Sequence, residues 1–266
     1  MSSGAGSIAM GSPLAAVALL TRRELVRFFR QPSRIIASIG TPMLIWILLG
    51  SGFAGSFTGA AGDGSYASFL LPGMMAMTVL FGSIFAAISL IEDRHEGFAQ
   101  SVLVSPAPRW SLIGAKVIGT SVLAGGQAAV LIPAVAIVGP MPSASGVVLA
   151  LVVLLLIGAG MAGLGLGLAW VVDSTQGFHG IMNLVLLPMW ILSGAVFPLS
   201  GAAGPMRIVM LVDPLTWPTE ALRSALNGVP AGVPGGDAGA WAGAVAFVVI
   251  GVSIAVLGMG RDRAVA

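Results

Sequence analysis

The chain has 266 residues, of which 57% are hydrophobic and only 8% are charged. Soluble globular domains carry about 25% charged residues, so this composition excludes a water-soluble protein and indicates one that is surrounded by lipid. With no cysteine and a net charge of +2, the sequence offers no thiolate site, no disulfide framework and no basic patch for nucleic acid.

The first element in chain order is an amphipathic segment over Leu14–Arg30. The residues that would share one helical face are Leu14, Val17, Ala18, Thr21, Leu25, Phe28 and Phe29. Arg23, Arg27 and Arg30 would lie opposite. This pattern is typical of a helix in the membrane interface. The alternative is an ordinary helix outside the membrane that packs on protein.

Six apolar stretches follow, each long enough, or nearly so, to cross a bilayer as a helix. They are Arg34–Phe53, Tyr66–Ile91, Leu112–Val138, Gly146–Val172, Ile181–Phe197 and Trp241–Gly258. We therefore predict an all-α polytopic membrane protein. A six-helix core over Arg34–Gly258 would form a single membrane domain with the rest of residues 1–266.

Lysine and arginine are distributed unevenly between the two sides of this six-helix arrangement. One side would carry Arg22, Arg23, Arg27, Arg30, Arg34, Arg94, Arg109, Lys116, Arg261 and Arg263. The other side would carry only Arg207 and Arg223. Because basic residues favour the cytoplasmic side, we expect both termini in the cytoplasm and the chain in the plasma (inner) membrane.

The connection between the last two spans, Pro198–Ala240, is expected outside the cell. Within it, Met206–Val212 and Thr219–Leu226 are predicted as short helices, separated by the helix-breaking pair Asp213-Pro214.

Small residues recur every fourth position in the fourth span, at Ala159, Gly163 and Gly167. Such spacing lets two helices approach closely. The partner could be another subunit or a helix of the same chain, and we favour the same chain.

Enzymatic and metal sites are not supported by the sequence. The only lysine, Lys116, follows Ala115, so the chain has no P-loop, and we expect no ATP hydrolysis and no cofactor in it. One Glu-x-x-His run, at Glu92, His95 and Glu96, falls short of the paired runs of a di-iron bundle. Asp173, Ser174 and His179 are the residue types of a hydrolase, but a polar loop is favoured over catalysis. These readings argue against an intramembrane enzyme.

A secondary transporter or channel is the other alternative. Such proteins commonly carry ionisable side chains within the bilayer. Here Gln127 and Asn183 are the main polar residues at depth. The scarcity of charge is more typical of a protein whose energy comes from a partner.

The connection after the second span carries a family resemblance. It reads Glu92-Asp93-Arg94-His95-Glu96-Gly97, then Leu103, Ser105-Pro106, Arg109 and Gly114-Ala115-Lys116. This resembles the cytoplasmic loop of ABC-2 type permeases, the six-helix exporters that include the daunorubicin resistance permeases. Further along, Pro188, Ser193-Gly194, Phe197-Pro198 and Asp213-Pro214-Leu215-Thr216 resemble the fifth helix and external loop of that family.

The resemblance implies a permease subunit that moves a drug, a lipid or a lipid-linked or polysaccharide substrate out of the cytoplasm. It implies a homodimer or heterodimer bound to P-loop ATPase subunits, which would hold ATP and Mg. The residues expected to couple to the ATPase are Arg23, Arg27, Arg30, Glu92, Glu96, Gly97, Phe98 and Leu103. From Glu92 onward, these acidic residues would surround the apolar anchors Phe98 and Leu103 in a docking helix. A merely solvated loop is the alternative.

Overall fold

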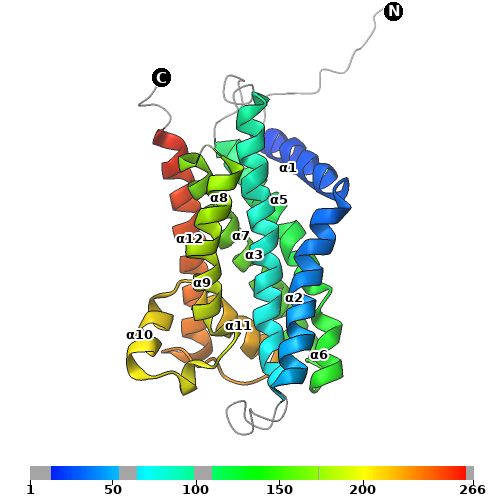
Figure 1. The fold of residues 1–266 in the computed structure, drawn as a ribbon, viewed down its shortest axis with the longest axis vertical. Coiled ribbons are helices and arrows are strands. Elements are labelled where there is room, and N and C mark those ends of the chain that lie inside the picture. The colour runs from blue at the N-terminus through cyan, green and yellow to red at the C-terminus, as the bar shows by residue number, and fades with distance from the viewer. Residues whose placement is uncertain (1–12, 54–64, 99–109, 173, 262–266) are drawn as a thin grey trace, which may run out of the picture.

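The computed structural model describes residues 13–53, 65–98, 110–172 and 174–261, and every regular element within these ranges is a helix (Figure 1). The long helices run side by side along the long axis of the molecule. Helix α1 lies across one end of them, and α10 lies at the other end. We call these the α1 end and the α10 end. The predicted all-α fold is confirmed.

Six helical segments are long and apolar enough to cross a membrane, and they confirm the six predicted spans. Their bounds are Pro32–Gly52 (α2), Tyr66–His95 (α3), Trp110–Val138 (α5 and α6), Ala144–Val171 (α7), Thr175–Ala195 (α8 to η2) and Gly236–Met259 (within α12, Gly236–Arg261). Helix α3 continues one turn beyond the predicted end at Ile91. Hydropathy misses this turn because its residues are polar.

Helix α1 spans Pro13–Phe29 and crosses α5 at close range. The Thr21 hydroxyl donates to the carbonyl of Ala115 at 3.4 Å, and Gly119 leaves room for the side chain of Glu24. Part of the predicted apolar face therefore packs on protein. Leu14, also on that face, is exposed. The structure thus contains both a packed and an uncovered portion of the amphipathic helix.

Helix α3 is the most buried of the spans, with Leu70, Met74, Leu80 and Ile84 almost inaccessible. Helix α7 packs against α3, α5 and α12, so α3 and α7 together form the middle of the bundle (Figure 1).

Proline interrupts the third span. Helix α5 (Trp110–Ala129) ends just before α6 (Ile132–Val138), in which Pro133 occupies the first turn. Proline has no N–H to donate to the carbonyl four residues earlier, which explains the break.

The fifth span contains two wide helical turns. Helix α8 (Thr175–Ile181) leads into the π-turn η1 (Met182–Leu186), then α9 (Leu187–Trp190) and a second π-turn, η2 (Ile191–Ala195). Pro188 lies between the wide turns. Near the end of the span, Gly194 has a φ of +78°, a left-handed conformation that glycine adopts without a steric penalty.

Three short helices lie between the fifth and sixth spans at the α10 end: η3 (Leu199–Gly201), α10 (Gly204–Val212) and α11 (Thr216–Asn227). The last two confirm the helices predicted in this segment. They differ in burial, because α10 exposes Ile208 and Val212 whereas α11 buries Ala221 and Leu222.

Candidate functional site

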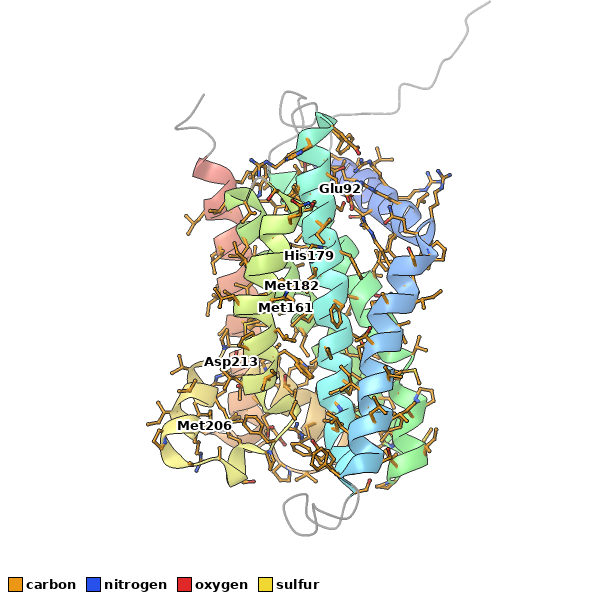
Figure 2. The ribbon with its side chains drawn as sticks, viewed as in Figure 1. Glu92, Met161, His179, Met182, Met206 and Asp213 are labelled. Atoms are coloured by element: carbon orange, nitrogen blue, oxygen red, sulfur yellow. The ribbon has the colours of Figure 1, made fainter. Side chains whose placement is uncertain are left out.

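Seven charged side chains from four helices meet where α1 crosses the ends of α3 and α5. We call this group the charged junction. Its members are Arg23, Glu24, Arg27, Arg34, Glu92, Asp93 and Lys116. Glu92 marks the position of the junction in Figure 2, beside α1.

Asp93 is the centre of the charged junction, and its side chain is completely buried. One carboxylate oxygen accepts from Arg27 at 2.7 Å and from Arg23 at 3.0 Å. The other oxygen lies 2.8 Å from the ammonium of Lys116. A buried carboxylate is tolerated only when it is paired, and here three cations from two helices supply the pairing.

Lys116 is buried as deeply as its partner, with 2% of its side chain exposed. Its ammonium also lies 3.2 Å from Glu24 on α1 and 3.3 Å from the Ser89 hydroxyl on α3. This one side chain on α5 therefore holds both α1 and α3.

Glu92 joins α3 to two further arginines. Its carboxylate accepts from Arg27 on α1 at 2.8 Å and from Arg34 on α2 at 3.1 Å. The neighbouring Arg94 points the other way and donates to the carbonyl of Ala169 near the end of α7, at 3.0 Å. It also lies over the ring of Trp170. Three consecutive residues of α3 thus contact α1, α2, α5 and α7.

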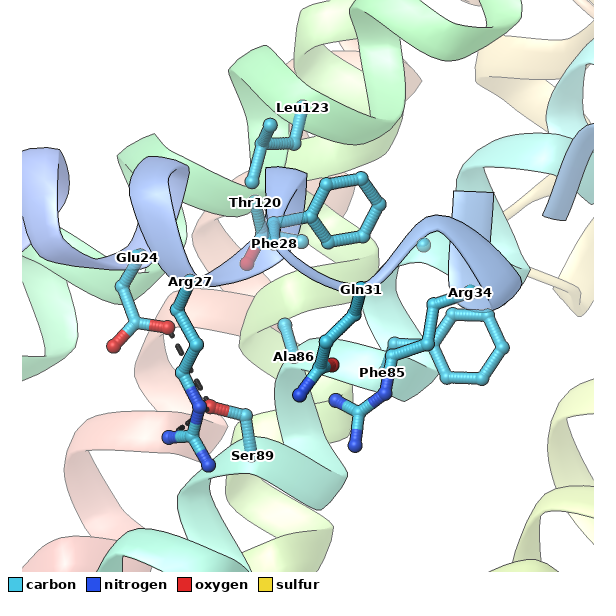
Figure 3. Close-up of a pocket in the computed structure, with 11 residues that line it drawn as sticks. Glu24, Arg27, Phe28, Gln31, Arg34, Phe85, Ala86, Ser89, Thr120 and Leu123 are labelled. Carbon is cyan, nitrogen blue, oxygen red and sulfur yellow. Dashed lines mark hydrogen bonds between the residues drawn. The ribbon is translucent and has the colours of Figure 1, made fainter. Parts of the chain in front are cut away.

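A small cavity of about 30 Å³ lies beneath α1, beside the charged junction (Figure 3). Arg27, Glu24 and Ser89 form one wall, and Gln31, Arg34 and Phe85 form another. The space suits a water molecule, which such a polar lining would hold.

The outward surface of α1 has a different character. Arg22 and Arg30 are exposed and make no ion pair within the described part of the chain, and between them Leu19 and Val26 are exposed at 60% and 44%. Together with Arg23, these residues line a shallow groove. We call this the α1 groove; it is basic at its edges and apolar in its middle.

The structure separates the residues expected to couple to an ATPase. Arg23, Arg27 and Glu92 belong to the charged junction, so their charges are neutralised within the chain. Arg30 and Glu96 are exposed instead. Whether any of them touches an ATPase stays a prediction.

The remaining coupling candidates lie just after α3. Gly97 has a φ of +77°, which turns the chain at the helix end. Phe98 lies under the guanidinium of Arg23, 3.5 Å from the ring centre. An attraction between cation and ring holds this segment against α1. Leu103 is outside the described residues.

The small residues of the fourth span face α12 of the same chain. A Cβ atom at Gly163 would collide with the backbone of Gly251, and one at Gly167 would collide with Ile254. Ala159, one turn earlier, is half-buried. The two glycines therefore allow backbone contact between α7 and α12.

The candidates for metal and hydrolase chemistry have other partners or lie apart. Glu92 is held by two arginines, as described above. The Ser174 hydroxyl accepts from the amide of Gly177 at 3.0 Å and so caps α8. His179 is exposed on the same helix, and Asp173 is outside the described residues.

The pairing of Asp93 with Lys116 is the main feature that the sequence analysis missed. There, Lys116 counts among the basic residues of one side, is excluded from a P-loop and appears in the family resemblance, but has no acidic partner assigned to it. A usable signal was present, because Lys116 lies almost two turns inside a helix that carries no other charged residue. A charge at such a position requires an opposite charge nearby.

Comparison with known proteins places the chain in a family. Residues 15–227 match the ABC-2 type transporter family. A protein of Cyanophora paradoxa that is named as a transport permease, ycf38, is 26% identical over 208 residues, which cover 77% of this chain and 72% of the relative.

Two bacterial proteins are also similar to the chain. Nodulation protein J of Neorhizobium galegae is 27% identical over 206 residues, covering 75% of this chain and 76% of that protein. A protein of Escherichia coli K12 named as a multidrug ABC transporter permease, YbhR, is 24% identical over 152 residues, covering 56% and 41%. With most of its length matching the family and six spans in the structure, this chain belongs to the ABC-2 type transporter family and is a multi-pass membrane permease.

Proposed function

We propose that the chain is the membrane subunit of an ATP-driven exporter, that its α1 end faces the cytoplasm, and that α1 receives force there from a separate P-loop ATPase. Two such permease subunits, identical or similar, would complete the transporter. The substrate class expected from the family resemblance is a drug, a lipid or a lipid-linked or polysaccharide molecule.

The charged junction is the observation that supports this proposal most directly. A permease without its own nucleotide site needs a surface to receive force and a stiff connection to carry that force into the membrane. The α1 groove offers the surface. Asp93, Lys116 and Glu92 tie α1 to α2, α3 and α5, and Arg94 continues the connection to α7.

The α1 groove fits an ATPase surface that carries acidic residues around an apolar side chain. Arg22 and Arg30 retain charge for such a partner because no acid of the described chain neutralises them. Leu19 and Val26 offer the apolar contact area. Opposite charges at the rim of an interface raise the association rate and fix the register of binding.

A secondary transporter is the alternative function, and the position of the charges argues against it. In the described parts of the spans, ionisable side chains lie within about two turns of a helix end: Arg34, Glu92, Asp93, Arg94, His95, Lys116, His179 and Asp237. Proton- and ion-coupled pumps place such groups near the middle of the bilayer.

The proposal is tested by reconstitution with a candidate P-loop ATPase, sought first among the products of neighbouring genes. The permease alone is expected to hydrolyse no ATP, and hydrolysis is expected to respond to the permease in the complex. Reversing two charges of the α1 groove, with Arg22→Glu and Arg30→Glu together, should weaken binding of the ATPase at least tenfold. Arg207→Glu, an exposed charge at the α10 end, is the matched control. Equal binding by both variants would refute the assignment of this surface.

The segment after α3 is tested separately. If it docks on the ATPase, Glu96→Arg should uncouple ATP hydrolysis from transport while the amount of chain in the membrane stays normal, because Glu96 is exposed. Phe98→Ala should act in the same direction by releasing the segment from Arg23. Full transport by both variants would count against a coupling role.

Orientation is tested with reporter fusions. Fusions after Gln176 and Arg263 are expected to report the cytoplasm, and fusions after Ser143 and Gly235 the outside. A cytoplasmic signal at Gly235 would overturn the proposed orientation.

A further inference from the structure

The fifth span ends in a helical break that lies against α3. Its last turn is the π-turn η2, and Gly194 within it has a left-handed conformation. The side chain of Trp190 donates to the carbonyl of Gly73 on α3 at 2.8 Å, and Ala195 lies directly against Gly73. The close contact exists because Gly73 has no side chain.

Arg223 on α11 closes this break. One of its terminal nitrogens donates to the carbonyl of Gly194 at 2.6 Å, and its guanidinium lies 4.2 Å from the ring centre of Phe69 on α3. Only 9% of the residue is exposed. A single side chain therefore contacts α3 and the end of the fifth span at once.

Glu220 keeps the Arg223 side chain in place. It is one turn earlier on α11, is slightly more buried than the arginine, and forms an ion pair with it. Its other carboxylate oxygen accepts from the amide of Gly232 at 2.8 Å. The carboxylate is thus fixed from two sides, which restricts where the guanidinium can lie.

Helix α11 is itself attached to the rest of the bundle away from the fifth span. The Trp217 ring lies against Gly243 of α12, and the Ser224 hydroxyl donates to Asp237 at 2.8 Å. Gly146 of α7 lies against the carbonyl of Ala225. The arginine therefore extends from a fixed helix to a broken one.

The charge of Arg223 distinguishes its bond to the Gly194 carbonyl from ordinary apolar packing. A helix end carries unsatisfied carbonyls and a partial negative charge, which a cation stabilises. A buried ion pair, however, is often no more stable than apolar side chains of the same volume. The pair is better suited to selecting one arrangement of two helices than to adding stability.

We propose that Arg223 is a positioning residue for transport: it holds the broken end of the fifth span closed against α3 and α11, and this end opens only when the bond from Arg223 to Gly194 breaks. The inference rests on the chain being a transport permease. It does not depend on the identity of the ATPase or on which side is cytoplasmic.

The absence of cysteine allows a direct test with a single introduced thiol. Ser193→Cys places the thiol in η2, where the serine is fully buried and donates to Trp190. Its reaction with N-ethylmaleimide, measured on the full-length chain in membrane vesicles, reports opening of the break. Adding Arg223→Met should accelerate this reaction about 10- to 100-fold, the loss expected for a charged hydrogen bond.

Three further variants distinguish local opening of the fifth span from general destabilisation of the chain. Ser83→Cys in the middle of α3, also buried, should react at an unchanged rate when Arg223→Met is added. Arg207→Met should leave position 193 unaffected. Arg223→Lys should restore much of the protection, because it keeps a cation near Gly194 and Glu220.

Two outcomes would overturn the proposal: no acceleration at position 193, or equal acceleration at positions 193 and 83.

If Arg223→Met does not accumulate in the membrane, Glu220→Gln provides the same test. It keeps an oxygen for the Gly232 amide but removes the charge that fixes the arginine. A smaller acceleration at position 193 alone is then expected. An unchanged rate would refute the inference. The reaction rates at positions 193 and 83 can be measured without transport and without a partner ATPase, so this test can fail independently of the proposed function.

Discussion

The ammonium of Lys116 on α5 lies 2.8 Å from the carboxylate of Asp93 on α3, and both side chains are shielded from solvent. Neither charge could occupy this position alone, because removing a single charge from water without a partner costs several kcal/mol. The pair therefore ties the ends of two membrane spans together, and Glu24 of α1 joins it through the same lysine.

Removing the charge of Asp93 should destabilise the chain strongly. Asp93→Asn leaves Lys116 buried with Glu24 as its one remaining acid and removes the negative charge that Arg23 and Arg27 share. We expect a loss of about 3 kcal/mol in the free energy of unfolding, measured on the purified chain in detergent. Glu96→Gln removes an exposed acid nearby and should change the free energy of unfolding by less than about 0.5 kcal/mol. Equal effects of the two substitutions would show that the pair contributes nothing.

Arg27 and Arg30 should differ in their effects although they are only three residues apart, Arg27 in the last turn of α1 and Arg30 directly after it. Arg27→Ala removes bonds to Asp93, Glu92 and Ser89, so amide hydrogen exchange in α1 should become at least about tenfold faster. Arg30 has no ion pair within the described chain, and Arg30→Ala should leave exchange unchanged. Faster exchange in both variants, or in neither, would mean that the ion pairs of the charged junction do not account for the stability of α1.

Gly163 and Gly126 form a second matched pair. A methyl group at Gly163 would meet the backbone of Gly251, whereas one at Gly126 would meet nothing within 4 Å. Gly163→Ala should therefore separate α7 from α12 and lower the free energy of unfolding by about 2 kcal/mol. Gly126→Ala should be neutral or stabilising, because alanine is favoured over glycine inside a helix. Thermal unfolding of the two variants in the same detergent distinguishes these outcomes.

The spans were predictable because length and hydropathy alone identify a helix that crosses a bilayer. The π-turns of the fifth span were not, since Pro188 predicts an irregularity but not whether the backbone widens, bends or stops. The extra turn of α3 was also hidden. Its charged residues look like a loop until their partners on α1, α2 and α5 are known.

The charged junction, too, could be predicted only in part from the sequence. The sequence marks Arg23, Arg27 and Glu92 as important, but not that they bind one another. Their pairing depends on α1 folding back across α3 and α5, a contact between residues more than sixty positions apart. Arg223 was seen only as one of two basic residues on its side, because its role requires the position of Gly194 in space.

Asp213, between α10 and α11, should make stability depend on pH. It is 6% exposed, and burial raises the pKa of its carboxyl group from 3.8 to about 7. One oxygen accepts from the amide of Leu215 at 3.0 Å, and the other is buried without a hydrogen-bond donor among the described residues. The Leu215 amide therefore compensates only part of the charge when the group ionises, and desolvation of the buried carboxylate outweighs it.

The sign of the effect follows from the direction of the shift. Because the folded chain binds this proton more tightly than the unfolded chain, the protonated carboxyl stabilises the fold fully below about pH 4. That stabilisation decreases as pH rises and is lost above about pH 7, a change of about 4 kcal/mol. Asp213→Asn keeps the acceptor for Leu215 and cannot ionise, so it should be more stable than the parent chain at pH 8 and nearly equal to it at pH 4. Unfolding midpoints measured at both pH values test this, with Glu96→Gln as the control. If Asp213→Asn were no more stable than the parent at pH 8, the buried carboxylate would have to be compensated in a way that the described contacts do not show.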